Sequence, residues 1–417
     1  MKDISVLVLR DFENDFDSNA NTLEMNLLAE SAGVEVAYDY HFKRDKPDPR
    51  TFMGKGHVEM LGMCVAENEA NVVIFSEDLN PSQIRNLEKS IDCRVIDRTQ
   101  LILDIFAQRA RSNEGKLQVE LAQLEYLLPR LTGKGVEMSR IGGTSGGGVA
   151  TRGPGETKLE TDKRRIRTKI SALKENIEKV VKQREVSSSK RKEMNVPLVS
   201  LVGYTSAGKS TLLNKLSDSN VEAHARLFAT LDPTTRRVNI PDSNSIFLTD
   251  TVGFLSRLPH GIIAAFKATL EEAKDSDFLI HVIDAYHPDI QNQITSVNDV
   301  LGELNIADKP TIMVFNKCDL LQNTSDLRAL VGEYEHACYI SALNGDGLES
   351  LHEKIKEVMK SIFLKVKVIL PFDKGDLLAL CHKSCEVTFL EYLDNGTYIE
   401  MSIPRELAYK FQDYQIL

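Results

Sequence analysis

The stretch GYTSAGKS, residues 203–210, decides the fold of the central part of this chain. It follows the apolar run VPLVSLV (196–202) and precedes TLLNKL (211–216), so a strand, a glycine-containing turn and a helix are expected in that order. The spacing G-x-x-x-x-G-K-S, in that context, is typical of a phosphate-binding loop. The stretch therefore predicts an α/β domain that binds a nucleotide.

Each residue type in this loop has a physical role in phosphate binding. The glycines let backbone N–H groups curl around an anion. The Lys209 ammonium is expected at the β- and γ-phosphates, and the Ser210 hydroxyl is a predicted ligand of Mg²⁺. Free N–H groups at the start of the following helix extend the site toward the α-phosphate. The predicted phosphate-binding residues are Gly203, Tyr204, Thr205, Ser206, Ala207, Gly208, Lys209, Ser210 and Thr211.

Two later segments have the order and character of nucleotide switches. LFATLDPTTRRV (227–238) offers Thr230, Thr234 and Thr235 as candidates to close on the γ-phosphate. DTVGF (250–254) follows a strand-like run. In it Asp250 is expected to hold Mg²⁺ through a water and Gly253 to offer its N–H to the γ-phosphate, with Thr251 and Val252 between them. Ras-type enzymes place a water-orienting glutamine next, whereas this chain has Phe254, so we expect a partner to complete the hydrolytic site.

The base is predicted to be guanine. FNKCD (315–319) ends a strand-like run, and the Asp319 carboxylate can accept hydrogen bonds from guanine N1–H and the exocyclic amine, which adenine cannot offer in that arrangement. Asn316, Lys317 and Cys318 belong to the same motif. Ser341, Ala342 and Leu343 follow another strand-like run and are expected to form a second wall. GTP and GDP are therefore the predicted ligands, with Mg²⁺ as cofactor, and Lys209 and Gly253 are expected to act in hydrolysis together with the switch threonine.

The rest of the chain carries fewer chemical signals. Residues 1–110 alternate strand-like runs (5–9, 34–38, 71–75, 93–97) with helical segments, which indicates a parallel sheet. GKG at 54–56 lacks a full nucleotide fingerprint, so a plain helix entry is favoured over an ATP site. Apolar stripes at 117–128 and 159–180 predict two long helices that pair as an antiparallel hairpin. The glycine-rich segment 131–157 joins them.

Composition limits the class of protein. The net charge is −10, yet residues 152–192 hold fourteen Lys/Arg against six Asp/Glu, a local surplus of eight that suits a polyanion or a solvated helix face. No apolar run approaches the roughly 20 residues of a membrane helix, and the start of the chain does not read as a signal peptide, so we expect a cytoplasmic protein. The six cysteines form no C-x-x-C pair, and CHKSC (381–385) is interpreted as two ordinary thiols.

Nearly the whole chain resembles the HflX family of ribosome-associated GTPases. The resemblance rests on TFMGKGHVEML (51–61), GGGVATRGPGETKLETDKRRI (146–166), GYTSAGKSTL, FATLDPTTRR, DTVGF and NKCD. It implies an α/β region at 1–112, a helical hairpin with a glycine-rich loop at 113–192, a Ras-like G domain at 193–362 and a small α+β domain at 363–417. It also implies that Thr230 is a direct Mg²⁺ ligand, in a switch formed by Phe228, Ala229, Thr230, Leu231 and Asp232.

Further expectations follow from the resemblance. Such proteins bind the large (50S) ribosomal subunit and split or rescue stalled 70S ribosomes, with ribosomal RNA contacted through the hairpin and its loop. A monomer whose GTP hydrolysis is stimulated by the ribosome is expected. Two alternatives stay open: an RNA-binding switch in which hydrolysis only times release, and a GTP-regulated protein-interaction module whose basic hairpin is merely solvated.

Overall fold

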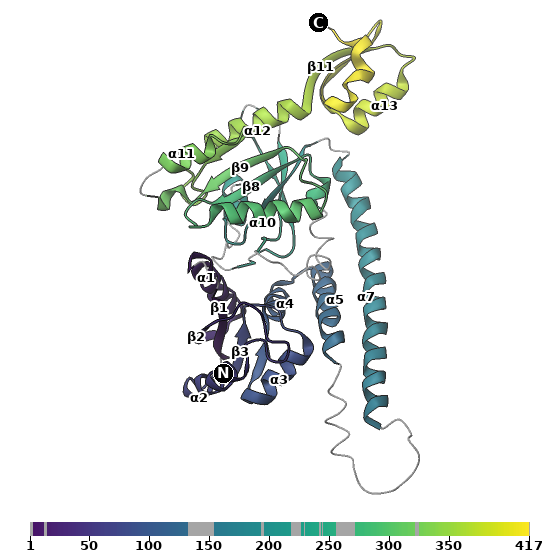
Figure 1. The fold of residues 1–417 in the computed structure, drawn as a ribbon. Coiled ribbons are helices and arrows are strands. Elements are labelled where there is room, and N and C mark those ends of the chain that lie inside the picture. Colours follow the sequence, from purple (N-terminus) through teal and green to yellow (C-terminus); the bar gives the residue numbers. More distant parts are fainter. Residues whose placement is uncertain are drawn as a thin grey trace. The chain divides into compact units, whose positions relative to one another are not determined.

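The computed structural model describes residues 3–11, 15–131, 154–192, 196–217, 227–228, 230–241, 243, 245–255, 272–321 and 325–416. The chain divides into two compact units (Figure 1). The first contains Met1–Lys179 and Ala225–Leu231, and the second contains Val180–His224, Asp232–Arg257 and Ala268–Leu417. Each unit has its own β-sheet structure and its own hydrophobic core.

The first unit is built on a four-stranded parallel sheet in the order β2-β1-β3-β4. Its strands are β1 (Ile4–Asp11), β2 (Glu35–Lys43), β3 (Val72–Phe75) and β4 (Arg94–Ile96), which correspond to the four predicted apolar runs. Helices α2 (Lys55–Glu67) and α3 (Pro81–Ile91) cover one face, where Leu61 and Leu87 pack on Val73 and Phe75. Because side chains alternate across a strand, α1 (Asp15–Ala32) and α4 (Arg98–Arg109) are left to cover the other face.

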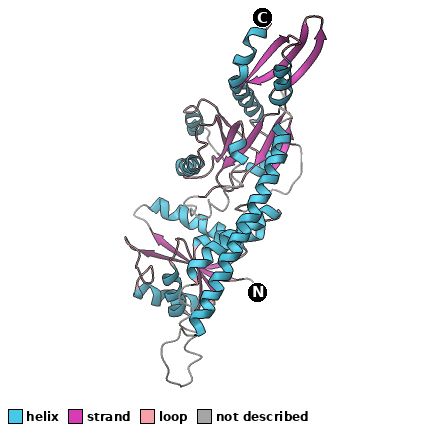
Figure 2. Ribbon diagram, turned by 90° about the vertical axis from the view of Figure 1, so that its right-hand side faces the viewer, coloured by secondary structure: helices cyan, strands magenta, loops and turns pink. Residues whose placement is uncertain are grey.

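The predicted hairpin helices are present, but they pair less completely than expected. They are α5 (Asn113–Arg130) and α7 (Pro154–Lys192), which run side by side in Figures 1 and 2. Ion pairs join Lys169 to Glu120 and Lys174 to Glu125. Of the α7 stripe, Leu173 is buried while Ile166, Ile170, Ile177 and Val180 stay partly exposed. The expectation that each helix buries the other's stripe is therefore met only in part.

The second unit carries a six-stranded sheet in the order β10-β9-β8-β5-β7-β6, in which only β6 is antiparallel to its neighbour. The strands are β5 (Leu198–Gly203), β6 (Thr234–Val238), β7 (Ile246–Asp250), β8 (Phe278–Asp284), β9 (Thr311–Asn316) and β10 (Ala337–Tyr339). The described helices are α8 (Lys209–Leu216), α10 (Ile290–Glu303), α11 (Ser325–Val331), α12 (Leu348–Ile362) and the short η1 (Cys318–Leu320).

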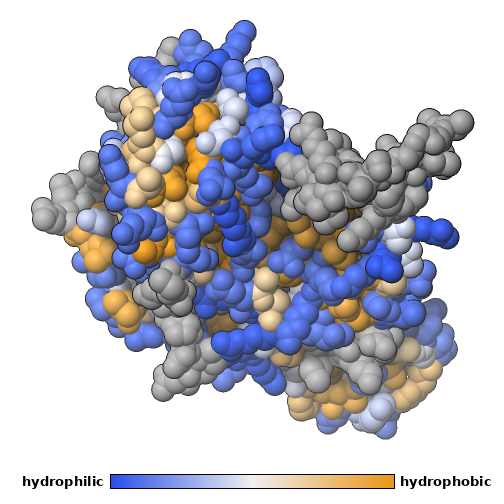
Figure 3. All heavy atoms as spheres, turned by 90° about the horizontal axis from the view of Figure 1, so that it is seen from below, coloured by the Kyte–Doolittle hydropathy of each residue, from blue (hydrophilic) through white to orange (hydrophobic). Residues whose placement is uncertain are grey.

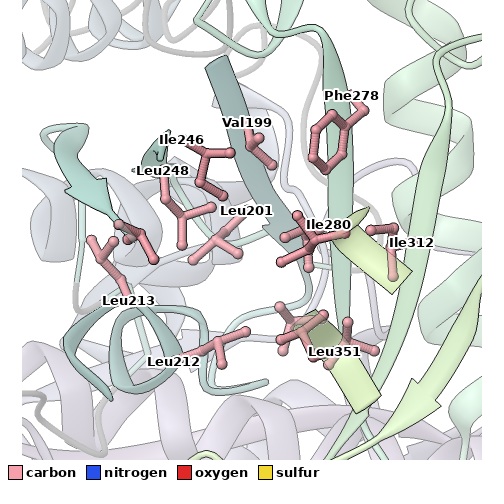
Figure 4. Packing of buried hydrophobic residues seen from close by; sticks show 14 of the residues in the cluster. Val199, Leu201, Leu212, Leu213, Ile246, Leu248, Phe278, Ile280, Ile312 and Leu351 are labelled. Carbon is pink, nitrogen blue, oxygen red and sulfur yellow. The ribbon is translucent and has the colours of Figure 1, made fainter. Parts of the chain in front are cut away.

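A dry core joins this sheet to the helices on one of its faces. Leu201, Leu248 and Ile280 point from neighbouring strands toward Leu212 of α8 and Leu351 of α12 (Figure 4). These side chains are fully buried. The core fixes β5 and α8 against each other, so it also fixes the two ends of the loop that connects them.

The C-terminal part of the second unit is a three-stranded antiparallel sheet, β11-β13-β12, with helical segments over its core. Its elements are β11 (Phe363–Leu370), α13 (Gly375–Ser384), β12 (Glu386–Leu393), β13 (Gly396–Pro404) and η2 (Arg405–Tyr414). Cys381 and Cys385 are buried there, and the described residues contain no cluster of His, Cys, Asp or Glu suited to a metal. The predicted α/β class, with a small α+β region at the end, is confirmed.

In the view of Figure 3, hydrophilic residues surround several hydrophobic areas on the surface of the described residues. Among the described residues, no helix has the length and apolar character that crossing a membrane requires.

Candidate nucleotide-binding site

The predicted phosphate loop lies where the sequence places it, between the end of β5 and the start of α8. Gly203 has a φ of 149°, and a Cβ added to it would lie 2.1 Å from the carbonyl oxygen of Val282 on β8. Gly208 has a φ of 97°, and its added Cβ would lie 2.2 Å from the Asn316 amide nitrogen. Both positions therefore require glycine, because any side chain would collide with a neighbouring strand or motif.

Lys209 is held inside this loop. Its side chain is 6% exposed, and its ammonium donates hydrogen bonds to the carbonyl oxygens of Gly203, at 2.9 Å, and Tyr204, at 2.8 Å. Burial lowers the pKa of Lys209 to about 8, while the nearby Asp250 carboxylate acts in the opposite direction. Because burial disfavours the charged form of Lys209, an anionic ligand beside the ammonium would stabilise that charge.

The turn that follows β7 lies against the same loop. A Cβ on Gly253 would come within 2.9 Å of Thr205 Cα and 3.1 Å of Lys209 Nζ. The Thr205 hydroxyl is buried and finds no hydrogen-bond partner within the described ranges. Thr251 is buried with its hydroxyl donating to the Leu201 carbonyl at 2.6 Å, and Val252 is buried beside it. Gly253 thus forms a side-chain-free wall beside the Lys209 ammonium.

The residues predicted to hold Mg²⁺ within this unit suit that ion. Ser210 Oγ donates to Asp250 Oδ2 at 2.6 Å, and Asp250 ends β7 almost completely buried. A hydroxyl and a carboxylate side by side are hard oxygen donors, which Mg²⁺ prefers. The donor set therefore fits the predicted ion; ligation by Ser210 and a water-mediated role for Asp250 stay predictions.

Phe254 has a structural role that its sequence position did not reveal. Its side chain is 2% exposed, so the ring lies in the interior. Its N–H donates to the Gly203 carbonyl at 3.1 Å, and its own carbonyl accepts from Thr205 N–H at 2.7 Å. Phe254 therefore fastens the Gly253 turn to the phosphate loop through its backbone, and its ring is an interior anchor rather than a substitute for a water-orienting side chain.

The base-recognition motifs converge on one side chain, Asn316. Its amide nitrogen donates to the Ala207 carbonyl at 2.7 Å, and its amide oxygen accepts from the Ala342 N–H at 2.9 Å. It thereby links the phosphate loop to the Ser341–Ala342–Leu343 segment. Ser341 and Ala342 are buried, whereas Asp319 is exposed and Leu343 is 72% exposed. Asp319 and Leu343 are thus accessible to a nucleotide base.

Sequence reasoning missed two residues near these motifs. Asp284, at the end of β8, pairs with Lys317 at 2.6 Å, and Lys317 has a left-handed backbone conformation with a φ of 66°. The position of Asp284 at the carboxyl end of a parallel strand was a usable signal, because strand ends meet at one edge of the sheet. His281, three residues earlier and buried, gave no signal beyond its apolar surroundings.

The predicted switch residues divide between the units. We use the name switch segment for residues 227–231. Leu227, Phe228 and Leu231 are buried, Thr230 is half-buried, and Ala229 lies outside the described residues. The switch segment belongs to the first compact unit, whereas Asp232 and the phosphate loop belong to the second. The direct Mg²⁺ ligation by Thr230 therefore stays a prediction.

We predict an acid-sensitive stability for the second unit because of His281. Burial, reinforced by the Lys209 charge, lowers the pKa of His281 to about 3 from an ordinary value near 6.5. The unfolded chain then binds the proton more tightly, so the stabilisation is present above pH 6.5 and is lost as the pH falls below it. Between about pH 7 and pH 5 the loss is roughly 2 kcal/mol. Calorimetric unfolding at these pH values should show it, and His281→Gln should reduce the difference; an equal difference in both proteins would contradict the assignment.

Comparison with known proteins bears on all of these segments. Residues 19–107 match the family described as GTP-binding GTPase N-terminal, residues 109–191 its middle region, and residues 198–317 the family described as 50S ribosome-binding GTPase. The GTPase HflX of Escherichia coli K12 is 44% identical over 377 residues, which cover 89% of this chain and 87% of the relative.

The chain belongs to the HflX family of GTPases. GTPase HflX of Lacrimispora saccharolytica is 40% identical over 408 residues, covering 98% of this chain and 95% of that one. The crystal structure of SsGBP in complex with GDP matches with a TM-score of 0.50 and 27% identity, covering 86% of this chain and 98% of SsGBP. The predicted family and the predicted GTPase activity are confirmed.

Proposed function

We propose that this HflX-family GTPase binds the large ribosomal subunit in its GTP state, splits or rescues stalled 70S ribosomes, and hydrolyses GTP faster when bound. The observation that carries the enzymatic part is the arrangement of Lys209, Ser210–Asp250 and Asn316 around one loop. The ribosomal part is supported by the match of residues 198–317 to a 50S ribosome-binding GTPase family. We further propose that the protein acts as a monomer in the cytoplasm.

The chemistry proposed for the site needs charge stabilisation more than covalent help. Lys209 places its ammonium on the β- and γ-phosphate oxygens, and the Gly253 N–H donates to the γ-phosphate as it leaves GDP. Ser210 and Thr230 would ligate Mg²⁺, and Asp250 would hold it through a water; the ion would supply positive charge that neutralises the phosphates. Phe254 keeps the Gly253 turn against the loop, so the attacking water has to be oriented by a group outside this turn.

Guanine selection is proposed to use the exposed Asp319 carboxylate, with the Lys317 stem and Leu343 on either side of the base. Asn316 links the phosphate loop, through the Ala207 carbonyl, to the segment that carries Leu343, through the Ala342 N–H. The Lys317–Asp284 pair holds the Lys317 stem in place.

The basic surface of α7 supports an RNA-contacting role for the hairpin. Arg164, Arg165 and Arg167 are exposed on this helix, at one end of the segment that the structure describes. Such a surface favours phosphate contacts, whose strength falls as salt rises. We propose that these arginines and the adjoining glycine-rich segment 131–157 contact ribosomal RNA, and that domain boundaries near 112, 192 and 362 separate this part from the GTPase and C-terminal parts.

Steady-state GTP turnover with and without purified 50S subunits tests the proposal. We expect stimulation of about tenfold or more with 50S subunits and none with 30S subunits, because partner-supplied groups act on the hydrolytic step. Replacing Arg164, Arg165 and Arg167 by glutamine should reduce 50S binding and its salt dependence. The matched control replaces the exposed Lys360 of α12 and Lys365 of β11 by glutamine and should bind normally. Turnover that no concentration of 50S subunits changes would contradict stimulation; stimulation with unchanged binding of the arginine variant would contradict the hairpin's role.

A further inference from the structure

Thr205, the third residue of the phosphate loop, has a buried hydroxyl whose hydrogen-bonding capacity is unused. The residue is 5% exposed, and its Oγ has no hydrogen-bond partner among the residues that the structure describes. Two other buried hydroxyls of this unit do have partners. Ser200 Oγ lies 2.6 Å from Ser276 Oγ, and Thr251 Oγ donates to a backbone carbonyl at 2.6 Å. Buried polar groups are normally hydrogen-bonded, so an unpartnered hydroxyl inside a ligand-binding loop points to a bond made with the ligand.

Backbone hydrogen bonds hold Thr205 against the Gly253 turn. The Thr205 N–H donates to the Phe254 carbonyl at 2.7 Å, and the Phe254 N–H donates to the Gly203 carbonyl at 3.1 Å. Tyr204 and Phe254 form a bridge of the parallel type between these bonds. The two chain segments therefore run side by side at this point, and the Thr205 side chain starts from a backbone position that is fixed relative to Gly253.

The space beside Gly253 is bordered by Thr205 and by Lys209. A Cβ built on Gly253 would lie 2.8 Å from Thr205 Cγ2 and 3.1 Å from Lys209 Nζ. Rotation about χ1 from one staggered position to another moves the hydroxyl oxygen of a threonine into the place of its methyl group. That rotation breaks no hydrogen bond here, because the hydroxyl makes none with the described residues. The Thr205 hydroxyl is therefore able to reach the same space as the Lys209 ammonium.

We propose that Thr205 is a catalytic residue whose hydroxyl donates a hydrogen bond to an oxygen of the γ-phosphate, beside the Lys209 ammonium and the Gly253 N–H. In hydrolysis the water oxygen bonds to the γ-phosphorus, and the bond from that phosphorus to the β–γ bridging oxygen breaks. One proton of the water stays on the attacking oxygen and the other passes to the released phosphate. Thr205 keeps its own proton and stabilises charge on the transferred group. The inference rests on the γ-phosphate position proposed above.

Thr205→Val tests this role because it replaces the hydroxyl by a methyl group and keeps the branched shape. GDP has no γ-phosphate, so the lost bond should weaken GTP binding alone. We expect the ratio of affinities for a GTP analogue with an imido β–γ bridge over GDP to fall about tenfold. The kcat/KM for GTP should fall by about 10- to 100-fold, the range for a hydrogen bond to a charged group. Thr205→Ser keeps the hydroxyl and should retain both values.

Thermal stability without nucleotide gives a second measurement, and its expected sign is opposite. Thr205→Val removes an unpartnered buried hydroxyl, so the melting temperature of the nucleotide-free protein should rise by about 2–4 °C. The matched control is Ser200→Ala on β5, which removes a buried hydroxyl that has a partner in Ser276. Ser200→Ala should lower the melting temperature and leave the affinity ratio unchanged. Damage to the fold would lower both quantities together, whereas the proposed role moves them in opposite directions.

An unchanged affinity ratio in Thr205→Val would overturn the proposal, as would an equal loss in Thr205→Ser or a lower melting temperature in Thr205→Val. Lys209→Ala distinguishes this failure from failure of the proposed site. If Lys209→Ala leaves GTP hydrolysis unchanged, the γ-phosphate position is wrong, and the role of Thr205 falls with it. If Lys209→Ala lowers hydrolysis while Thr205→Val changes neither the ratio nor kcat/KM, the role of Thr205 alone is wrong.

Discussion

Replacing Lys209 by alanine is expected to lower GTP turnover by about 10²- to 10³-fold, the size of the loss when one charge-stabilising donor is removed from a transition state. The ammonium is buried against the Gly203 and Tyr204 carbonyls, so no neighbouring cation can move into its place without rebuilding the loop. Nucleotide affinity should fall as well, because the same charge contacts the phosphates before hydrolysis. Single-turnover hydrolysis at saturating GTP, together with titration of GDP, separates the two effects.

The matched control is Lys215→Ala, which removes an exposed lysine from the last turn of the same helix, α8. It should hydrolyse GTP at the rate of the unaltered protein. Comparable losses in both variants would mean that helix α8, rather than the Lys209 charge, is being disturbed.

The second large effect is a change of base specificity in Asp319→Asn. An asparagine side chain can donate to the 2-oxo group of xanthine but cannot accept both guanine donors, so the variant should lose about 10⁴-fold in its preference for GDP over XDP. Asp319 is exposed at the end of the N-K-C-D motif, so its replacement leaves the core unchanged. Competitive titration with GDP and XDP measures the ratio directly.

Asp346→Asn is the control for this change. The Asp346 side chain is exposed. Burial raises the pKa of the Cys318 thiol, and the carboxylates of Asp319 and Asp346 raise it further, so Asp346 acts on the same neighbourhood without belonging to the base motif. It should retain the preference for GDP. If Asp319→Asn kept that preference too, base recognition would have to be reassigned to another residue.

The nucleotide motifs were predictable because each is a short run whose function depends on local geometry. Gly203, Gly208 and Lys209 follow from spacing alone, and the structure shows the close approaches that make glycine necessary at 203 and 208. Family, fold class and GTPase activity followed from the same runs. The base-binding roles of Asp319 and Leu343 are still predictions, as is the role of Thr230.

Other features depend on contacts between distant residues, which a single sequence does not show. The residue type of Phe254 suggested a missing catalytic group, yet its burial and its backbone bonds to the phosphate loop give it a structural role. The apolar stripe of α7 predicted a hairpin in which both helices bury their stripes. The stripe alone does not reveal that the partner helix α5 is about half as long as α7. Likewise, nothing in FATLD indicates that Phe228 packs on Phe106.

Asn316 has a consequence for how this site can change over evolution. One amide side chain accepts from the Ala342 N–H and donates to the Ala207 carbonyl, 109 residues away along the chain. Altering it to suit another purine would also loosen the loop that binds the phosphates. New base preferences are therefore expected to be easier to acquire at the exposed Asp319 than at Asn316, where one amide group joins the phosphate loop to the Ser341–Ala342–Leu343 segment.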